Sequence, residues 1–340
     1  MSSGTRRGST EYVLKSLFAG GVAGCAAKTL IAPLDRVKIL FQTNNAHFAK
    51  YAGSMRGLWG ATRDIWQHNG VRGLFQGHAA TLLRIFPYAA IKFMAYEQYR
   101  GLLMPTRQHE TVWRQFWAGS FAGITSVVFT YPTELVRVRM AYNIDSNRRR
   151  GILATCRDIV EESRAATARV EPRPALQWPA SVSAFYRGFF MTVAGMIPYA
   201  GVSFCTHAAL VDVCRARFPA ITTMPLSEAN ASADSRTHAK AKRDGRAPLR
   251  VWAELLCGGL SGATAQTVSY PLEVIRRRLQ VFGVQHPGSR PSALSVARDI
   301  WATRGLRGFF VGLSIGYIKV MPMAAVAFTV YDHMKWLLNM

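Results

Sequence analysis

Apolar residues gather in six long stretches of the chain, and polar segments separate them. The stretches cover residues 13–34, 79–95, 116–130, 189–213, 255–270 and 311–330. Each is about long enough to cross a bilayer, since a transmembrane helix needs ~20 residues. All of them include Gly, Ser, Thr or a lone charge, which is typical of helices packed round a polar interior. The pattern predicts an all-α membrane protein with six transmembrane helices. Six buried helices of a soluble protein are the less favoured alternative.

Three shorter stretches repeat apolar residues every three or four positions, the period of an amphipathic helix. Their apolar residues are Leu58, Trp59, Ile65 and Trp66; Ile152, Cys156, Ile159 and Val160; and Leu294, Ala297, Ile300 and Trp301. A one-sided apolar pattern places one helix face on a protein or lipid surface. Each stretch therefore predicts a short amphipathic helix in a loop.

One motif occurs three times: Gly-x-x-x-Gly, a proline nine residues later, an acid two after the proline and a base five after it. The prolines are Pro33, Pro132 and Pro271, and the acid–base pairs are Asp35/Lys38, Glu134/Arg137 and Glu273/Arg276. A recurring unit of this kind sets the architecture. It predicts three equivalent repeats round a pseudo-threefold axis.

We expect the repeats at residues 12–105, 110–218 and 249–340, with an exposed linker at 219–248. In each repeat an odd-numbered helix ends at the proline, a loop carries the short helix, and an even-numbered helix follows. The even helices are preceded by Phe75-Gln76-Gly77, Tyr186-Arg187-Gly188 and Phe310-Val311-Gly312. Backbone N–H groups at such helix starts suit a lipid phosphate, although a simple interfacial turn is an equal interpretation. Residues 163–182 lengthen the second loop.

The acids and bases of the three motifs, here called the proline-motif charges, have a spacing that predicts a gate. An acid and a base three residues apart share one helix face. Round a threefold axis, the acid of one helix therefore meets the base of the next. The proline bends each helix toward that axis. Gln42 and Gln280 fall nine residues after their prolines, where they can brace the ring.

The charge balance points to an anionic partner. Lys and Arg number 42 against 19 Asp and Glu, giving a formal net charge of +23. Anionic lipid, an anionic solute and nucleic acid are the options, and nucleic acid ranks last because no nucleic-acid motif is present. The five cysteines show no C-x-x-C spacing and the eight histidines are scattered. We therefore expect no enzyme, cofactor, metal site or disulfide. The first ten residues lack the apolar stretch of a secretory signal.

Cations that break the threefold symmetry mark the expected solute site. Arg84 and Lys319 each lie three residues before a proline of an even helix, and Gly195 takes that place in the second repeat. A cation facing lipid costs roughly 2.5–3.5 kcal/mol, so these side chains should line a polar cavity. The predicted substrate-binding residues are Lys28, Arg84, Lys92, Gly195, Met196, Tyr199 and Lys319. Snorkelling toward the interface is the alternative for Lys92, and packing is an equal alternative for Tyr88.

The P-x-[DE]-x-x-[RK] motif at the three prolines resembles the signature of the mitochondrial carrier family, and the resemblance covers nearly the whole chain. It implies a multi-pass six-helix bundle in the mitochondrial inner membrane, with the termini toward the intermembrane space. The proline-motif charges would form a matrix gate. A monomer would work by alternating access, with cardiolipin bound at the loop helices.

The family also has a second ring of form aromatic-[DE]-x-x-[RK]. Tyr96-Glu97…Arg100 and Tyr331-Asp332…Lys335 resemble it, whereas the second repeat has His207, Ala208 and Val211 in those positions. Glu97, Arg100, Asp332 and Lys335 are called the aromatic-motif charges below. The resemblance implies a cytosolic gate that is weaker than the matrix gate.

Residues 23–38, 84–88 and 309–319 resemble the coenzyme A carrier branch, and Gly195-Met196 resembles the adenine-accepting pair of nucleotide carriers. The leading hypothesis is a secondary transporter of coenzyme A, with exchange against ADP or 3′,5′-ADP. The alternative is another adenine-nucleotide carrier, of the ATP-Mg/phosphate or ADP/ATP type. Residues 276–281 differ from the Arg-Arg-Arg-Met-Met-Met run of ADP/ATP carriers, and no calcium-binding loop precedes the bundle. A membrane enzyme or a structural scaffold is the alternative from a different class of protein. Solute-dependent flux in liposomes would distinguish a transporter from both.

Overall fold

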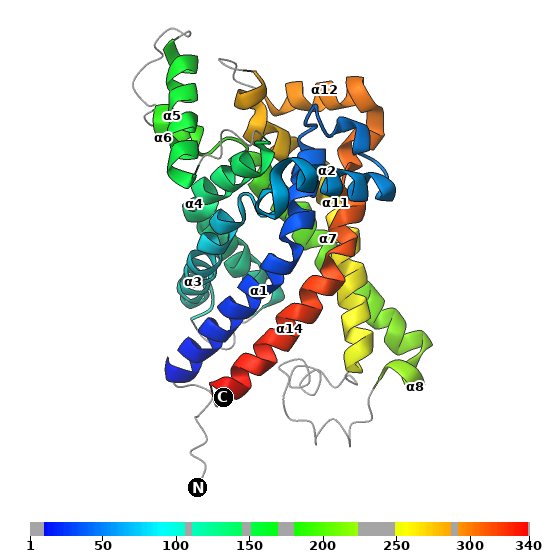
Figure 1. The fold of residues 1–340 in the computed structure, drawn as a ribbon. Helices are drawn as coiled ribbons and strands as arrows, with labels where there is room; N and C mark the ends of the chain where they lie inside the picture. The colour runs from blue at the N-terminus through cyan, green and yellow to red at the C-terminus, as the bar shows by residue number, and fades with distance from the viewer. Residues whose placement is uncertain are drawn as a thin grey trace. The chain divides into compact units, whose positions relative to one another are not determined.

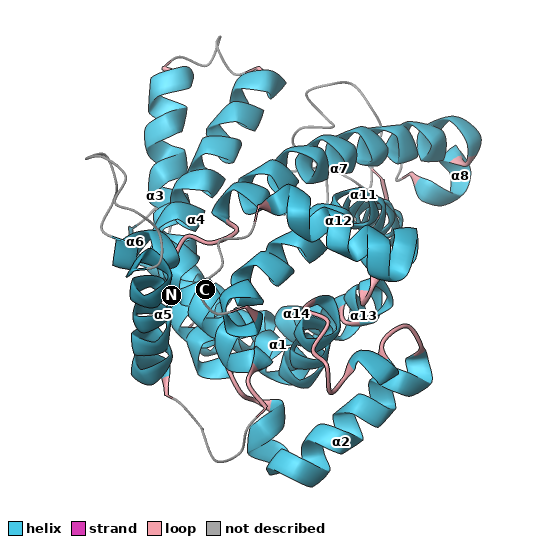
Figure 2. Ribbon diagram, turned by 90° about the horizontal axis from the view of Figure 1, so that it is seen from above, coloured by secondary structure: helices cyan, strands magenta, loops and turns pink. Residues whose placement is uncertain are grey.

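The structure, a computed structural model, describes residues 10–105, 111–144, 151–168, 180–223, 249–286 and 292–338. Within these ranges the regular structure is helical (Figure 2). The only β-type pairing among the described residues is one isolated antiparallel bridge between Thr223 and Leu249. This confirms the all-α prediction. The chain forms two compact units: unit one comprises residues 1–189 and 274–340, and unit two comprises residues 190–273.

The elements follow the order that the three repeats predict. They are α1 (Thr10–Gln42), η1 (Ala49–Tyr51), α2 (Met55–Leu74), α3 (His78–Leu103), α4 (Val112–Tyr142), α5 (Ile152–Ala168), α6 (Ala180–Ala184), α7 (Phe189–Arg217), α8 (Pro219–Thr222), α11 (Val251–Gln285), α12 (Ala293–Arg304), η4 (Gly305–Phe310), α13 (Leu313–Ile318) and α14 (Val320–Leu337). In unit one, α1 packs along α14, and α3 packs along α4 (Figure 1).

Long apolar helices account for the six predicted spans. Among the described residues, Leu14–Gln42, Val182–Arg217 and Ala293–Leu337 are long and apolar enough to cross a membrane. The helices α3, α4 and α11 have 26, 31 and 35 residues. At 1.5 Å per residue, each also exceeds the ~30 Å of a hydrocarbon core.

The odd helices do not end at their prolines, which corrects the sequence-based expectation. α1 runs nine residues beyond Pro33 to Gln42, and α4 and α11 also continue past Pro132 and Pro271. A proline removes only one hydrogen bond from the turn before it, so a helix can resume when packing stabilises the next turns. Val37 and Leu40, both fully buried, provide that packing in α1.

The sixth span is interrupted at Lys319, between α13 and α14. Pro322 has no N–H group to donate to the carbonyl of Ile318, four residues earlier. The missing hydrogen bond accounts for the interruption at this point. The residue at the interruption, Lys319, is one of the cations that the sequence assigns to solute binding.

Each even helix begins directly after a glycine with a left-handed backbone. The φ angles are +85° at Gly77, +82° at Gly188 and +84° at Gly312. A Cβ on Gly77 would also lie 2.9 Å from the carbonyl oxygen of Arg137. Conformation and close packing both require glycine here, so the start of α3 is fixed against the second half of α4.

The three predicted amphipathic helices are present as α2, α5 and α12. Each buries part of one face: Ile65, Ile159 and Ile300 are at most 2% exposed. On the other side, Trp66 and Trp301 are exposed. Most of the predicted linker, and residues 169–179 of the longer second loop, lie outside the described residues.

Unit two contains most of α7, then α8 and the first part of α11. The Sγ atoms of Cys214 and Cys257 lie 3.7 Å apart, well beyond the ~2.05 Å of a disulfide bond. All five cysteines are free thiols.

Candidate functional site

The first acid of the proline motifs, Asp35, lies on α1 and is 7% exposed. Arg137 of α4 places its Nη2 atom 2.9 Å from Asp35 Oδ2, and Lys319 places its Nζ atom 2.8 Å from Asp35 Oδ1. Each carboxylate oxygen therefore has its own cation. The resulting cluster joins α1, α4 and the break between α13 and α14.

The second acid, Glu134, lies on α4 and is 5% exposed. Arg84 Nη1 is 2.6 Å from Oε2, and Arg277 Nη1 is 3.0 Å from Oε1. Arg276 also pairs with Oε1. Glu134 thus gathers three guanidinium groups from α3 and α11.

These contacts join neighbouring odd helices in the order that the threefold register predicts. Asp35 of α1 meets Arg137 of α4, and Glu134 of α4 meets Arg276 of α11. The third predicted partners are Lys38, which is buried in unit one, and Glu273, which is half-buried in unit two. The first two acids therefore hold positions where opening the bundle would separate charges.

The two cations expected at the solute site, Arg84 and Lys319, contact the acids of the proline motifs. Arg84 binds Glu134 and Lys319 binds Asp35, although their side chains retain 27% and 18% exposure. The sequence assigns these cations and acids to separate sets. The structure brings them into one cluster.

Gln280 is fully buried and donates from Nε2 to the Tyr131 hydroxyl at 3.1 Å. Its Oε1 atom accepts a hydrogen bond from Arg277 Nη1 at 3.0 Å. Tyr131 in turn donates to the carbonyl oxygen of Arg187 at 2.7 Å. Gln280 therefore holds Arg277, a partner of Glu134, against the residue that precedes Pro132. Gln42, its counterpart on α1, is also buried.

A small cavity in unit one opens beside Asp35. Its polar lining includes Lys28, Asp35, Arg137, His78 and Thr81. Lys28 and Asp35, about two turns apart on α1, thus face the same space. A ligand phosphate entering here would meet cations from two helices.

Tyr88 is a residue whose role the sequence leaves undecided between packing and the solute site. The Arg84 guanidinium lies 5.5 Å from the centroid of the Tyr88 ring, and Lys92 Nζ lies 6.0 Å from it. Both distances suit cation–π contacts. Lys92 is exposed, so Tyr88 lies between a half-buried cation of α3 and an exposed one.

The remaining residues expected to bind solute, Gly195, Met196 and Tyr199, lie on α7 in unit two. Tyr199 is 46% exposed. A Cβ on Gly195 would lie 3.7 Å from Leu272 Cβ, an ordinary contact distance. Met196 is half-buried. These three residues offer accessible apolar and aromatic surface.

The aromatic-motif charges are arranged differently. Glu97 of α3 and Asp332 of α14 are both exposed, and within the described part of unit one neither forms an ion pair. Lys335 Nζ lies 5.2 Å from the centroid of the Tyr331 ring. The Tyr331 hydroxyl is 3.2 Å from Ser16 Oγ of α1. Arg100 is exposed on α3.

A second buried network lies outside the predicted site. Glu162 of α5 binds Arg139 Nη1 at 2.7 Å and also pairs with Arg187. Burial opposes ionisation of Glu162, but the hydrogen bonds and charges of the two arginines outweigh it, so the pKa of Glu162 lies below its usual range. A Cβ on Gly283 would collide with this carboxylate. The sequence held one signal for this network, because Arg139 and Arg278 each lie seven residues after the proline of their motif. Both arginines pair with an acid of a loop helix: Arg139 with Glu162 and Arg278 with Asp299.

Long apolar helices in three sequence repeats, together with buried ion pairs between helices of unit one, are typical of a membrane transporter built from internal repeats. The chain belongs to the mitochondrial carrier protein family, which matches it at residues 9–107, 108–166 and 247–340. It is therefore a transporter of the mitochondrial inner membrane.

Several carriers are similar over almost the whole chain. The mitochondrial carrier protein LEU5 of Saccharomyces cerevisiae is 50% identical, with 97% of this chain and 92% of the relative covered. Human solute carrier family 25 member 16 is 37% identical, with 95% and 88% covered. The mitochondrial adenine nucleotide transporter ADNT1 of Arabidopsis thaliana is 33% identical, with 96% and 87% covered.

Proposed function

We propose that this carrier moves coenzyme A across the mitochondrial inner membrane by alternating access, in exchange for an adenine nucleotide such as ADP or 3′,5′-ADP. The observation that carries the proposal is the cluster round Asp35 and Glu134. Five cationic side chains meet two carboxylates there. Such an excess of positive charge in a membrane interior needs an anionic ligand.

The phosphates of coenzyme A would compete with the two carboxylates for their cations. Charge-assisted hydrogen bonds to phosphate are as suitable for Arg84 and Lys319 as those to carboxylate. A phosphate that engages Arg84 weakens its hold on Glu134, and one that engages Lys319 weakens its hold on Asp35. Solute binding and release of the acids are then one event.

This competition supplies the gating step. Ion pairs between neighbouring odd helices close the matrix side, with the chain termini toward the intermembrane space. A solute can shift the carrier only by binding the two conformations differently. Phosphates that replace the buried carboxylate contacts provide that difference. The exposed Glu97 and Asp332 support a state open on the opposite, cytosolic side.

The adenine ring of the solute has candidate contacts of its own. Within unit two, Gly195, Met196 and Tyr199 of α7 are at least partly accessible. Within unit one, Tyr88 lies near the cations Arg84 and Lys92. A relative named as an adenine nucleotide transporter, at 33% identity, supports an adenine-containing solute. The resemblance of residues 84–88 to coenzyme A carriers favours coenzyme A over ADP or ATP as the main solute.

We also propose that the carrier works as a monomer with cardiolipin bound near the loop helices. The left-handed glycines Gly77, Gly188 and Gly312 start helices there, and helix N-termini favour phosphate groups. Thermal stabilisation by cardiolipin, but not by a zwitterionic lipid, would support this assignment.

Transport by the purified full-length carrier in proteoliposomes tests the proposal. Vesicles loaded with ADP or 3′,5′-ADP are given labelled coenzyme A, dephospho-coenzyme A or ADP outside. We expect fastest uptake for coenzyme A and slower uptake of the dephospho form, which lacks the 3′-phosphate. ADP or ATP uptake exceeding that of coenzyme A would support the adenine-nucleotide alternative instead. No uptake of any of them would overturn both.

A further inference from the structure

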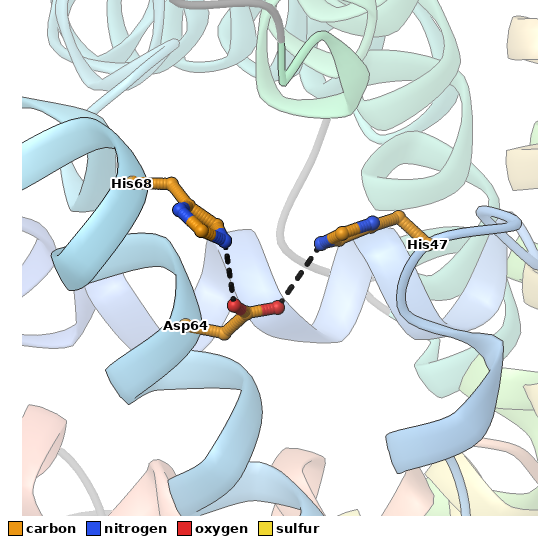
Figure 3. A group of neighbouring side chains, drawn as sticks. All are labelled: His47, Asp64 and His68. Carbon is orange, nitrogen blue, oxygen red and sulfur yellow. Dashed lines mark hydrogen bonds and ion pairs between the residues drawn. The ribbon is translucent and has the colours of Figure 1, made fainter.

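Two histidines and an aspartate converge in unit one, away from the ion-pair cluster (Figure 3). His47 follows α1 in the turn before η1, whereas Asp64 and His68 lie one turn apart on α2. His47 Nε2 is 3.1 Å from Asp64 Oδ2, and His68 Nε2 is 3.2 Å from Asp64 Oδ1. All three potential ligand atoms lie within 4.8 Å of one another.

The repeats show that Asp64 is missing a cation. Asp64 and Asp299 occupy the same place in Arg-Asp-Ile-Trp, at residues 63–66 and 298–301. Asp299 pairs with Arg278, seven residues after Pro271. In the first repeat that position is Leu40, which has no charge.

Asp64 is nevertheless the more enclosed of the two acids. Its side chain is 13% exposed, against 65% for Asp299. A carboxylate withdrawn from water needs a positive partner. Among the described residues its ion-pair partners are His47 and His68. A divalent cation between them would supply the charge that arginine supplies in the third repeat.

The geometry suits a small tetrahedral ion. Zinc binds imidazole nitrogen and carboxylate oxygen at about 2.0–2.2 Å, which places neighbouring ligand atoms about 3.3 Å apart. His47 Nε2 and His68 Nε2 lie 3.1 and 3.2 Å from the two different oxygens of Asp64, so a small movement of the imidazole rings would place one nitrogen of each ring and one carboxylate oxygen round an ion. The four-residue spacing of Asp64 and His68 puts both ligands on one helix face. The His47 and His68 side chains are 48% and 63% exposed, so an ion can enter from solvent.

The segment that carries His47 is held on both sides. The backbone N–H of His47 donates to Asn45 Oδ1 at 3.1 Å. Asn45 Nδ2 in turn donates to the carbonyl oxygen of Tyr142 at 3.3 Å. The next residue, Phe48, is 1% exposed in the packed core beside α1. Fixed ligands lose less entropy when they bind an ion.

We propose that His47, Asp64 and His68 form a binding site for a divalent transition-metal ion of the zinc type, with water or an anion as the fourth ligand. Imidazole ligands favour zinc over magnesium and calcium, which prefer oxygen ligands. The bound ion would tie the end of α1 to α2. It would therefore stiffen the connection between a gate-bearing helix and the loop helix.

Zinc titration of the full-length, tag-free carrier in detergent tests the site, after alkylation of the thiols so that cysteines cannot bind the ion. We expect one equivalent bound at this site and a rise in the unfolding temperature. Replacing both histidines, in the variant His47→Gln/His68→Gln, should weaken binding more than about tenfold, since even losing a supporting contact of a metal site costs 10–100-fold. His333→Gln, which changes an exposed histidine of α14, should bind zinc as the unchanged protein does.

Asp64→Asn provides an independent variant that keeps the size of the side chain. It should also weaken zinc binding, while magnesium should not displace zinc from the unchanged protein. Each variant is checked for its unfolding temperature without zinc, so loss of fold is distinguished from loss of ligand. Equal zinc binding by the double-histidine variant and the unchanged protein would overturn the proposal. So would equal weakening by His333→Gln.

Discussion

The proline-motif and aromatic-motif charges have similar sequence signatures but different surroundings. Asp35 and Glu134 are 7% and 5% exposed, and each contacts two or three cations. Glu97 and Asp332 are exposed and, within the described residues, take part in no ion pair. An acid and a base three residues apart therefore do not by themselves make a closed layer. Burial and the approach of a neighbouring helix decide it.

The difference matters energetically. Exposed ion pairs typically contribute ~0–1 kcal/mol, whereas removing one partner of a buried pair costs roughly 3–5 kcal/mol. The two sets of charges should therefore respond unequally to the same substitution. The following predictions test that inequality, from the largest expected effect to the smallest.

Reversal of the charge at Asp35 should have the largest effect. Asp35→Arg places a third cation beside Arg137 and Lys319, so transport should fall to background. Adding Arg137→Asp should restore part of it by re-forming a pair with opposite polarity. Coenzyme A uptake into proteoliposomes, at equal amounts of inserted protein, measures both effects.

Asp332→Arg is the matched control from the other set of charges. Because Asp332 is exposed, this reversal should reduce uptake far less than Asp35→Arg. Equal losses at the two positions would contradict the comparison. A complete lack of rescue by Arg137→Asp would contradict pairing between neighbouring helices.

Removal of Arg84 or Lys319 should come next. Hydrogen bonds to charged groups contribute about 1.5–3 kcal/mol, so each alanine variant should lower kcat/KM for coenzyme A roughly 10- to 100-fold. Lys50→Ala, which removes a lysine near Tyr51 in the loop after α1, should leave uptake near its normal rate. Near-normal uptake by both Arg84→Ala and Lys319→Ala would remove these residues from the solute site.

Glu162 extends the comparison to a half-buried acid outside the membrane-spanning helices. Glu162→Gln leaves Arg139 and Arg187 without their shared carboxylate, so the free energy of unfolding should fall by about 3 kcal/mol. Glu161→Gln changes the exposed neighbour and should alter the unfolding temperature little. Equal unfolding temperatures for the two variants would show that burial of Glu162 does not matter.

The same pair of proteins makes a pH prediction. Because the pKa of Glu162 is lowered in the folded carrier, its stabilisation is fully present above the unfolded glutamate value of about 4.3. It is lost as the pH falls from there toward the folded value. The difference in unfolding temperature between the unchanged protein and Glu162→Gln should therefore stay constant from neutral pH to about pH 5 and shrink below it.

Lys28→Gln should have the smallest effect. Lys28 lines the cavity beside Asp35 but takes part in no ion pair among the residues that the structure describes. Its counterparts in the other repeats are Val127 and Gln266. An ammonium group acts as a mobile point charge toward phosphate. The KM for coenzyme A should rise a few-fold and that for ADP less. An equal change for both solutes would indicate a structural role.

The sequence allowed the helices and the register of the ion pairs to be predicted because both follow from local periodicity. Proline spacing aligned Asp35 with Arg137 and Glu134 with Arg276. The contact of Arg277 with Glu134 was not predicted, because Arg277 follows the motif base Arg276 and has no place in the motif. It depends on how α11 is rotated about its own axis against α4. The further course of the odd helices beyond their prolines depends on tertiary packing of Val37 and Leu40.

Contacts that no repeated spacing in the sequence marks were the ones that could not be predicted. Glu162 and Arg187 pair although the lengthened second loop separates them in sequence. The added residues shift this part of the chain out of alignment with the other repeats, so no repeated spacing marks the pair. His47 is 17 positions from Asp64, and no standard metal-ligand spacing connects them. The sequence assigned Arg84 and Lys319 to solute binding, but their contact with Glu134 and Asp35 depends on the packing of even helices against odd ones.

The cluster at Asp35 and Glu134 has an electrical consequence. Five cations against two carboxylates give these seven side chains a formal charge of +3. Moving one charge through the membrane potential involves about 2.3 kcal/mol per 100 mV. An empty carrier would change its access with this charge uncompensated, so the return step should favour a loaded carrier. 3′,5′-ADP has as many ionisable phosphate oxygens as coenzyme A, and ADP has fewer. Exchange of coenzyme A with 3′,5′-ADP should therefore be insensitive to voltage, whereas exchange with ADP should generate a current.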